Sequence, residues 1–248
     1  MRSSAFYSVV ALLCARSVLL SDPDRTNSFS CSYAEGKVEV IRKGLTGGSA
    51  ISDAEVNATL PQNSLLCTGE KSLAEVTNEF ILIRLGSMSV LESVTNETVK
   101  IFSGSMLICL RDNAEIILKS EKASVSLKGK LTAIIECTSN GGFKFIPLEG
   151  KGTIIPQEGQ SKAIKSGRLM MVVGSPSKLG NAYDIDLLLM LKSSRLINSF
   201  PKPLPSIKSI SLAIYYQQLR LKGKFNALIG DAPTDDNLQM WAFGKDSK

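Results

Sequence analysis

The 248-residue chain contains no histidine, and this absence excludes more chemistry than any other feature of its composition. It removes the Ser-His-Asp and Cys-His nucleophile systems and every zinc site that needs an imidazole ligand. The five cysteines include no C-x-x-C pair, so neither a zinc ribbon nor a thioredoxin-like motif is expected. Cys67, Cys109 and Cys137 lie in apolar runs and are interpreted as small core residues; the other two are Cys14 and Cys31. If the chain is exported, one disulfide can form, but the spacing does not identify its partners.

Aromatic residues are also scarce, at 6% of the chain, while apolar residues make up 44%. A core of valine, isoleucine and leucine suits packed strands. Lys and Arg number 14 against 7 Asp and Glu over residues 151–248, but 15 against 16 over residues 1–150. The cations are scattered and no aromatic stripe accompanies them, so no nucleic-acid groove is expected. A basic face that aids solubility or contacts an acidic partner is the favoured interpretation.

No apolar run reaches the roughly 20 residues that a membrane span needs, because Arg16 interrupts the first one. An early Arg2, an apolar stretch from Ala5 to Cys14 and a small Ser21 are typical of a secretory signal. We therefore predict a signal peptide over residues 1–21, a polar linker over 22–32, and a periplasmic or extracellular mature chain without an integral membrane span. The alternatives to a signal peptide are an uncleaved amphipathic N-terminal segment and a wrongly assigned start codon.

Short strand signals dominate from residue 33 to residue 174, with turn residues every 8–12 positions. A sandwich, a barrel and a solenoid are all compatible with this pattern. Gly69, Gly86 and Gly104 are 17 and 18 residues apart, which suggests repeated coils of two strands. The predicted turns are Thr77-Asn78, Ser103-Gly104, Asp112-Asn113, Gly129, Asn140-Gly142 and Gly150.

The stretch "EGKGT" (149–153) superficially suggests a phosphate-binding loop. Such a loop needs Ser or Thr after its Gly-Lys pair and a helix that begins there. Here Gly152 follows Lys151, and the next residues, "TIIP", favour a strand. We interpret Glu149-Gly150 as a turn between two strands.

Several of these pieces together resemble the FecR domain. They are "EGKVEVIRKG" as an opening strand, "CTGEKSLAEV" followed by "ILIRLG" as a central pair, "VKIFSGSMLI" as the next strand, and "FIPLEGKGTII" with "KSGRLMMV" at the end. The resemblance covers roughly residues 33–174. Lys128-Gly129-Lys130 departs from the "RGT"-like turn usual in the family, and Arg168 stands where glutamine is common.

The resemblance implies a mainly β fold, a short β-solenoid or roll, followed in this chain by a small C-terminal helical segment. The name-giving members are inner-membrane regulators whose periplasmic FecR domain reads an outer-membrane receptor, while a cytoplasmic N-terminal segment controls a sigma factor. Only some thirty residues precede the first predicted strand, so the sigma-regulating segment is not expected here. The family pattern marks folding positions, and we therefore name no catalytic, cofactor-binding or metal-binding residue.

The C-terminal quarter changes to a helical pattern. We predict a helical hairpin over residues 175–223, packed against the β-domain, and a polar tail over 224–248. Its first helix would place Ile185, Leu188, Leu189 and Leu196 on one face with Asp184 as cap, although the run 187–191 also suits a strand. The second would use Ile207, Ile210, Ile214 and Leu221, place Gln217 and Gln218 on its polar face, and end at Gly223. A partner-facing or membrane-facing helix is the alternative.

These observations favour a non-catalytic, exported, FecR-like binding module in envelope signalling or sensing. Strand edges and turn loops would contact another envelope protein, no cofactor is expected, and the oligomeric state stays open. The alternative is a structural envelope protein that self-assembles on the same scaffold. A more remote one is a Ser-Lys hydrolase, since Ser175 to Lys178 matches S-x-x-K, but no S-D-N or K-T-G motif accompanies it.

Overall fold

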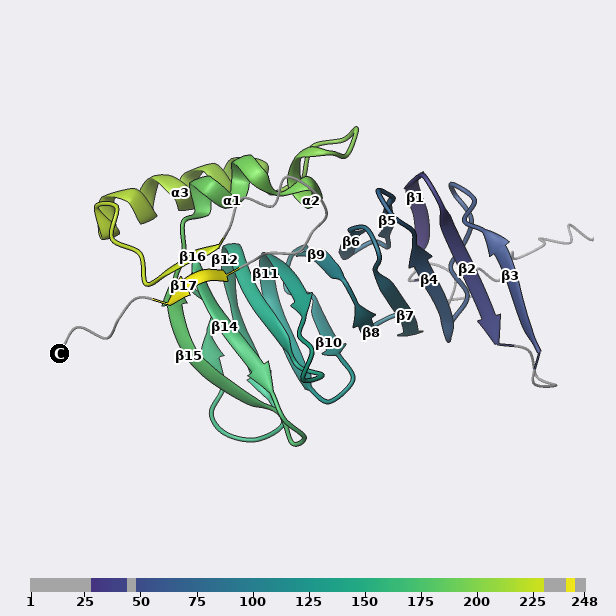
Figure 1. The fold of residues 1–248 in the computed structure, drawn as a ribbon, viewed down its shortest axis with the longest axis horizontal. Coiled ribbons are helices and arrows are strands. Elements are labelled where there is room, and N and C mark those ends of the chain that lie inside the picture. The colour runs from purple at the N-terminus through teal and green to yellow at the C-terminus, as the bar shows by residue number, and fades with distance from the viewer. Residues whose placement is uncertain (1–27, 44–47, 230–239, 244–248) are drawn as a thin grey trace, which may run out of the picture.

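The structure is a computed structural model that describes residues 28–43, 48–229 and 240–243. Within these ranges the chain forms a large curled sheet, three helices against the outer side of that sheet, and a separate two-stranded sheet (Figure 1). The predicted mainly β fold with a small C-terminal helical segment is confirmed.

The bounds of the elements follow in chain order. The strands are β1 (Ser30–Glu35), β2 (Val38–Lys43), β3 (Ser49–Asp53), β4 (Ser64–Thr68), β5 (Leu73–Thr77), β6 (Ile81–Leu85), β7 (Val90–Thr95), β8 (Thr98–Ser103), β9 (Ser105–Leu110), β10 (Glu115–Lys119), β11 (Ser124–Cys137), β12 (Phe143–Pro156), β13 (Lys162–Ala163), β14 (Arg168–Val173), β15 (Lys178–Asp184), β16 (Ala227–Ile229) and β17 (Met240–Phe243). The helices are α1 (Leu187–Ser193), α2 (Arg195–Asn198) and α3 (Ile207–Leu221).

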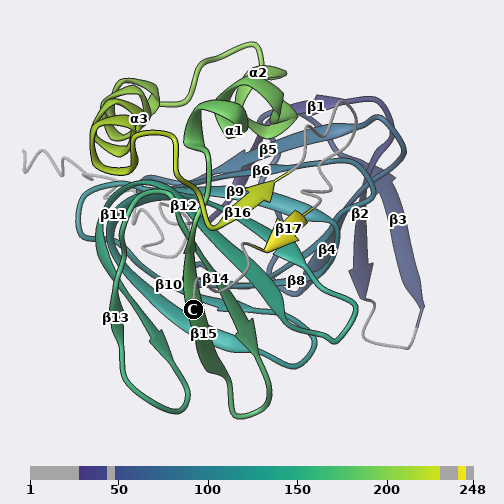
Figure 2. The ribbon, with the colours of Figure 1, turned by 60° about the vertical axis from the view of Figure 1, so that its left-hand side comes forward.

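The large sheet has two halves that the long strands β11 and β12 join. Strands β1, β5, β6 and β9 are neighbours in one half, and β10, β8, β7, β4, β2 and β3 are neighbours in the other. The first part of β11 pairs with β10 and its second part pairs with β9, so the sheet curls over where β11 bends (Figure 2). Apolar side chains from both halves fill the interior of this roll, among them Val38, Leu66, Ile83, Ile108 and Phe143. This shared interior explains why an aliphatic sequence with short strands folds as one body.

Two of the predicted turns are wrong. Gly129 lies inside β11 and Gly150 inside β12, and each strand runs through its glycine without a break. Gly150 has a φ of 120°, and a Cβ atom there would lie 2.4 Å from the Cα of Leu131 on the paired strand. These glycines therefore let two bent strands approach each other closely. The stretch "EGKG" is the bend of one long strand, and no helix follows it.

The glycines spaced 17 and 18 residues apart lie at corners, where the chain passes from one half of the sheet to the other. Gly69 accepts a hydrogen bond from Met88 N at the next corner, and Gly86 N donates to Ser105 O beside Gly104. Thr68 Oγ1 donates to Gly86 O, so side chains also connect successive corners. The spacing in the sequence thus corresponds to a stack of corners along one edge of the roll.

The helices cover the outer side of the half-sheet that contains β6 and β9. A second apolar cluster lies there, with Leu107, Ile134 and Ile146 from the strands and Met190 and Ile210 from the helices. The prediction that the helices pack against the β region is confirmed.

The first helix begins later than expected. Residues 178–184, which lie inside the segment predicted as a helical hairpin, form strand β15, and Asp184 lies at the end of that strand. Asp186 caps α1 instead, because its side chain accepts hydrogen bonds from the backbone N–H groups of Leu188 and Leu189. Leu188, expected on the buried face, is 36% exposed.

A buried arginine fastens the helices to the sheet. Arg84 of β6 has no exposed surface, and its Nε donates to Glu75 Oε2 of β5 at 2.8 Å. Its Nη atoms donate to three backbone oxygens of the helical segment, those of Leu196, Ile197 and Lys202. The guanidinium also lies 4.2 Å from the ring centroid of Phe200. Burial lowers the pKa of Arg84, and the Glu75 carboxylate opposes this effect.

The two ends of the chain depart from the predicted segments. The signal peptide predicted over residues 1–21 lies outside the described residues, as does most of the linker. Strand β1 begins at Ser30, inside the predicted linker, and Phe29 before it is buried. In the predicted polar tail, the backbone of β16 pairs with that of β17.

Candidate binding surface

Helix α3 carries a second apolar face that the rest of the described chain leaves exposed. The side chains of Leu212, Tyr215, Tyr216 and Leu219 are 53–60% exposed. Their spacing of i, i+3, i+4 and i+7 places them on one side of the helix. The two tyrosine rings lie side by side, with centroids 5.8 Å apart. Contiguous exposed apolar side chains of this kind are typical of interaction sites.

The opposite face of α3 holds the helix in place. Ile210 and Ile214 are buried against the sheet, as predicted, and the helix ends next to Gly223. Gln217, assigned to the polar face by its residue type, is 2% exposed. Its amide donates to Ile185 O at 2.6 Å and accepts from Leu187 N at 3.0 Å, so it binds α3 to the start of α1. The prediction for Gln217 is wrong because these backbone groups lie opposite it only after the chain has folded.

A groove runs beside the exposed face, between α3 and the bend of β12. Its volume is about 470 Å³, the largest of the hollows in the described part of the chain that we compared. Leu212, Ala213 and Tyr216 of α3 line one side, and Gly150 and Lys151 line the other. The "EGKG" bend therefore contributes to a surface feature, although not as a phosphate loop.

Positive charge surrounds this groove. Lys130 and Lys151 are exposed on the strand side, and within the described ranges no carboxylate lies at ion-pair distance from either. Arg220 lies on the helix side, where its Nη2 is 2.8 Å from Asp184 Oδ1. Helix α3 itself contains no acidic residue. The groove is thus apolar along the helix and basic across from it.

Among the described residues that line the groove, Glu149 carries the one carboxylate, and this carboxylate lies at the base of the groove. Glu149 is 7% exposed and accepts a 2.7 Å hydrogen bond from Thr132 Oγ1. Thr132 Oγ1 also lies 2.7 Å from Ser206 Oγ, at the residue before α3. Burial raises the pKa of Glu149, while the Thr132 hydrogen bond and Lys130 oppose the rise. The carboxyl therefore lies beneath the groove and interacts electrostatically with Lys130, while both lysine side chains stay exposed.

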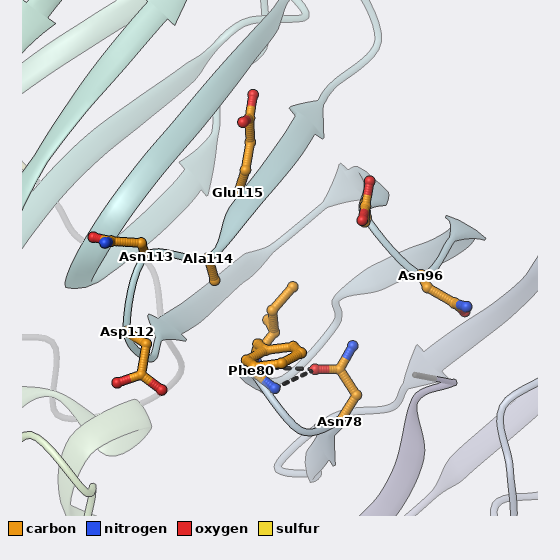
Figure 3. A pocket seen from close by; sticks show the side chains of 9 residues that line it. Asn78, Phe80, Asn96, Asp112, Asn113, Ala114 and Glu115 are labelled. Carbon is orange, nitrogen blue, oxygen red and sulfur yellow. Dashed lines mark hydrogen bonds between the residues drawn. The ribbon is translucent and has the colours of Figure 1, made fainter. Parts of the chain in front are cut away.

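A second hollow, of about 320 Å³, lies where three turns meet, those before β6, β8 and β10. Its polar side chains do not converge on a common point: in Figure 3 Glu115 and Asp112 point in opposite directions, as do Asn113 and Asn96. The side-chain oxygen of Asn78 accepts from the backbone N–H groups of Phe80 and Ile81, at 3.0 and 2.8 Å. Over the described residues, no group of three or more Cys, Asp or Glu side chains has the arrangement of a metal site. The groove beside α3 is therefore the stronger candidate.

The remote hydrolase motif does not form a nucleophile pair. Ser175 lies in the turn between β14 and β15, and Lys178 begins β15. The Nζ of Lys178 is 3.2 Å from Glu158 Oε1, with which it forms an exposed ion pair.

Four of the cysteines lie within the described residues. Cys31, Cys67, Cys109 and Cys137 are free thiols, and Cys109 is buried as expected while Cys67 and Cys137 are half-buried. Burial raises the pKa of Cys137 to about 12, and it also raises the pKa values of Cys31 and Cys67.

Strand edges and turn loops were predicted to contact a partner, and one exposed strand edge is present. Among the described strands, β3 pairs with β2 alone, and all five of its residues are exposed. The exposed face of α3, in contrast, was expected only under the alternative of a partner-facing helix, because the sequence pattern identified only the buried stripe. The residues at 212, 215, 216 and 219 repeat the same spacing on the other side of the helix, and this second stripe is the signal that could have revealed it.

Comparison with known proteins adds little to this geometry. No family model matches the chain, and no curated protein matches it. Two crystal structures of candidate anti-sigma factors from Parabacteroides distasonis are similar to it. One is 13% identical with a TM-score of 0.42 over 61% of this chain and 74% of the other, and the second is 12% identical with a TM-score of 0.40 over 52% and 64%. At these values the similarity supports no conclusion on function.

Fold and surface together describe a mainly β module with a helical cover and an apolar and basic groove. In the described ranges, no helix has the length and apolar character needed to cross a membrane.

Proposed function

We propose that this chain is a non-catalytic binding module of the FecR type, which contacts a partner protein through the outer face of α3 and the groove beside it. The observation that carries the proposal is the stripe of four exposed apolar side chains, Leu212, Tyr215, Tyr216 and Leu219. Such side chains dock readily because their burial releases ordered water, at about 25 cal/mol per Å² of apolar surface. The two tyrosine side chains also offer a large contact area at low entropic cost.

The finer parts of the proposal rest on the sequence. The signal-like residues 1–21 support export, and the strand and glycine pattern of residues 33–174 supports a FecR-like role in envelope signalling or sensing. The motif residues "TGEKSLAEV" and "ILIRLG" have a structural purpose in the fold. They supply the corner at Gly69 and the buried pair of Glu75 and Arg84, which holds the helices that carry the proposed surface.

Site-specific photo-crosslinking in the native host tests the proposal. A benzophenone side chain is placed at residue 212 on α3, at residue 51 on β3, or at residue 117 on β10, which are all exposed apolar positions. We expect residue 212 alone to give a crosslink to a different protein. Equal crosslinking at all three positions, or none at residue 212, would contradict the proposal. Cell fractionation of the same strains tests export.

Self-assembly is the second candidate, because the exposed edge strand β3 offers unpaired backbone groups to another copy. A crosslink from residue 51 to a second copy of this chain, together with sedimentation that depends on concentration, would favour it over the first.

A further inference from the structure

We propose that the occupant of the groove is an acidic amphipathic helix of the partner protein, an inference that rests on the proposed function and specifies the chemistry of the partner. The apolar residues of this helix would pack on Leu212, Tyr216 and Leu219, and its carboxylates would face Lys130 and Lys151.

The shape of the surface favours a helix. From Leu212 to Leu219 the stripe spans seven residues, or about 10 Å of helix axis at 1.5 Å per residue. A partner helix with apolar residues at the same spacing matches this stripe along two turns. The groove beside the stripe, of about 470 Å³, receives the side chains that project from such a helix. Packed helices lie about 8–10 Å apart, which is the distance that interlocked leucine and tyrosine side chains span.

The charge of the surface favours acidic flanks. Lys130 and Lys151 lie across the groove, and Lys208 precedes Leu212 by four residues on the same side of α3. No carboxylate of α3 competes for these cations, since the helix has none. A partner helix with Glu or Asp beside its apolar stripe would form ion pairs along both sides. These pairs would act mainly on selectivity and association rate.

Two other occupants fit the same observations less well. If a second copy of the chain bound here, α3 would pack against α3. The positive charges of Lys208 and Arg220 on one helix would then face those on the other, and neither helix has an acidic residue. A membrane surface is broad and smooth, whereas here Lys151 and Leu212 lie on opposite sides of a hollow. Surface-seeking helices also have a polar face rich in cations, and on α3 that side includes Ser211 and Gln218.

Three synthetic peptides of about 18 residues, or five helical turns, test the inference against the full chain. One carries leucine at helical spacing with glutamate beside it, the second has lysine in place of every glutamate, and the third has the composition of the first in scrambled order. Binding is measured by fluorescence anisotropy at low and at high salt. We expect only the first peptide to bind, and to bind about tenfold more weakly at high salt because exposed charges are screened.

A charge-reversed variant gives the matched control. Lys130→Glu with Lys151→Glu should weaken binding of the acidic peptide about tenfold or more. Lys71→Glu with Lys122→Glu makes the same change of net charge at exposed positions on other elements, and should leave binding within about twofold. The salt dependence of the unmodified chain provides a readout that does not depend on whether the variants fold.

Separate outcomes address the inference and the proposed function. If the acidic and basic peptides bind equally, or if only vesicles of equal parts phosphatidylcholine and phosphatidylglycerol bind, the inference is overturned. If neither peptide nor vesicle binds but residue 212 still crosslinks to a partner, the inference fails while the proposed function stands. If Leu212→Ser with Leu219→Ser leaves both peptide binding and partner crosslinking unchanged, both are wrong.

Discussion

The buried contact between Arg84 and the helical segment leads to the most demanding prediction. Arg84→Met removes the guanidinium but keeps most of the side-chain length, and it leaves the Glu75 carboxylate buried without its cation. The backbone oxygens of Leu196, Ile197 and Lys202 lose their donors at the same time. Breaking one side of a buried ion pair costs about 3–5 kcal/mol.

This loss is a large share of the roughly 5–15 kcal/mol by which a native protein is stable. With an m-value of about 2–3 kcal/mol per molar urea, the unfolding midpoint should fall by about 1–2 M. Because three of the lost hydrogen bonds reach the helical segment, amide exchange should accelerate most in α1, α2 and α3. Urea denaturation followed by circular dichroism, with hydrogen exchange by mass spectrometry, measures both effects.

Two further variants make the test specific. Arg42→Met changes the same residue type at an exposed position of β2 and should cost no more than about 0.5 kcal/mol. The double variant Arg84→Met with Glu75→Leu also removes the buried carboxylate that has lost its cation. It should therefore recover about 1 kcal/mol or more of the lost free energy of unfolding. If Arg84→Met costs no more than Arg42→Met, or if the double variant recovers nothing, the pair of Arg84 and Glu75 does not fasten the helices to the sheet.

The other predictions concern the corners, the groove and the thiols. Gly104→Ala should destabilise the chain by at least about 1 kcal/mol more than Gly159→Ala in urea unfolding. Both glycines have positive φ, but only at Gly104 would a Cβ meet Ser89, at 2.1 Å. Burial raises the pKa of Glu149 in the folded chain. The contribution of this carboxyl to the free energy of unfolding is therefore complete below its ordinary pKa of 4.5, and it is lost as the pH rises through the folded-state pKa. Glu149→Gln should therefore gain stability relative to the native chain between pH 4 and pH 8, and a constant difference would refute this. Cys137, with a pKa of about 12, should be alkylated by iodoacetamide at pH 8 far more slowly in the folded chain than in urea, because about one thiol in 10⁴ is ionised.

Several features of the fold could be predicted because they depend on local pattern. The strand alternation around Val38 and Val40, the turn at Asp112-Asn113 and the helix that ends near Gly223 all follow from neighbouring residues. Turn glycines were harder to interpret. Gly104 at a corner and Gly150 inside a strand have the same residue type and both have positive φ, yet only their pairing partners distinguish a turn from a bend.

The candidate site was less predictable than the fold. Helix α3 has apolar residues on two sides, and the sequence does not indicate which side packs against the sheet. Gln217, a polar residue, is buried because Ile185 O and Leu187 N need a partner there, while Tyr215 and Tyr216 stay exposed. Burial of a side chain depends on contacts that are distant in sequence, and residue type is only a guide to it.

Composition alone narrowed the chemistry open to this chain: without histidine, the Ser-His-Asp and Cys-His nucleophile systems and imidazole zinc ligands cannot be built. The sequence also determined the strand-rich character of residues 33–174 and the helical character of the segment after Pro205. The folded structure was needed to show that the "EGKG" bend of β12 lies opposite α3 and that together they form an apolar groove beside two lysines. The physical reason is that a groove belongs to two elements at once, and their approach is set by the curl of the sheet and the packing beneath the helix.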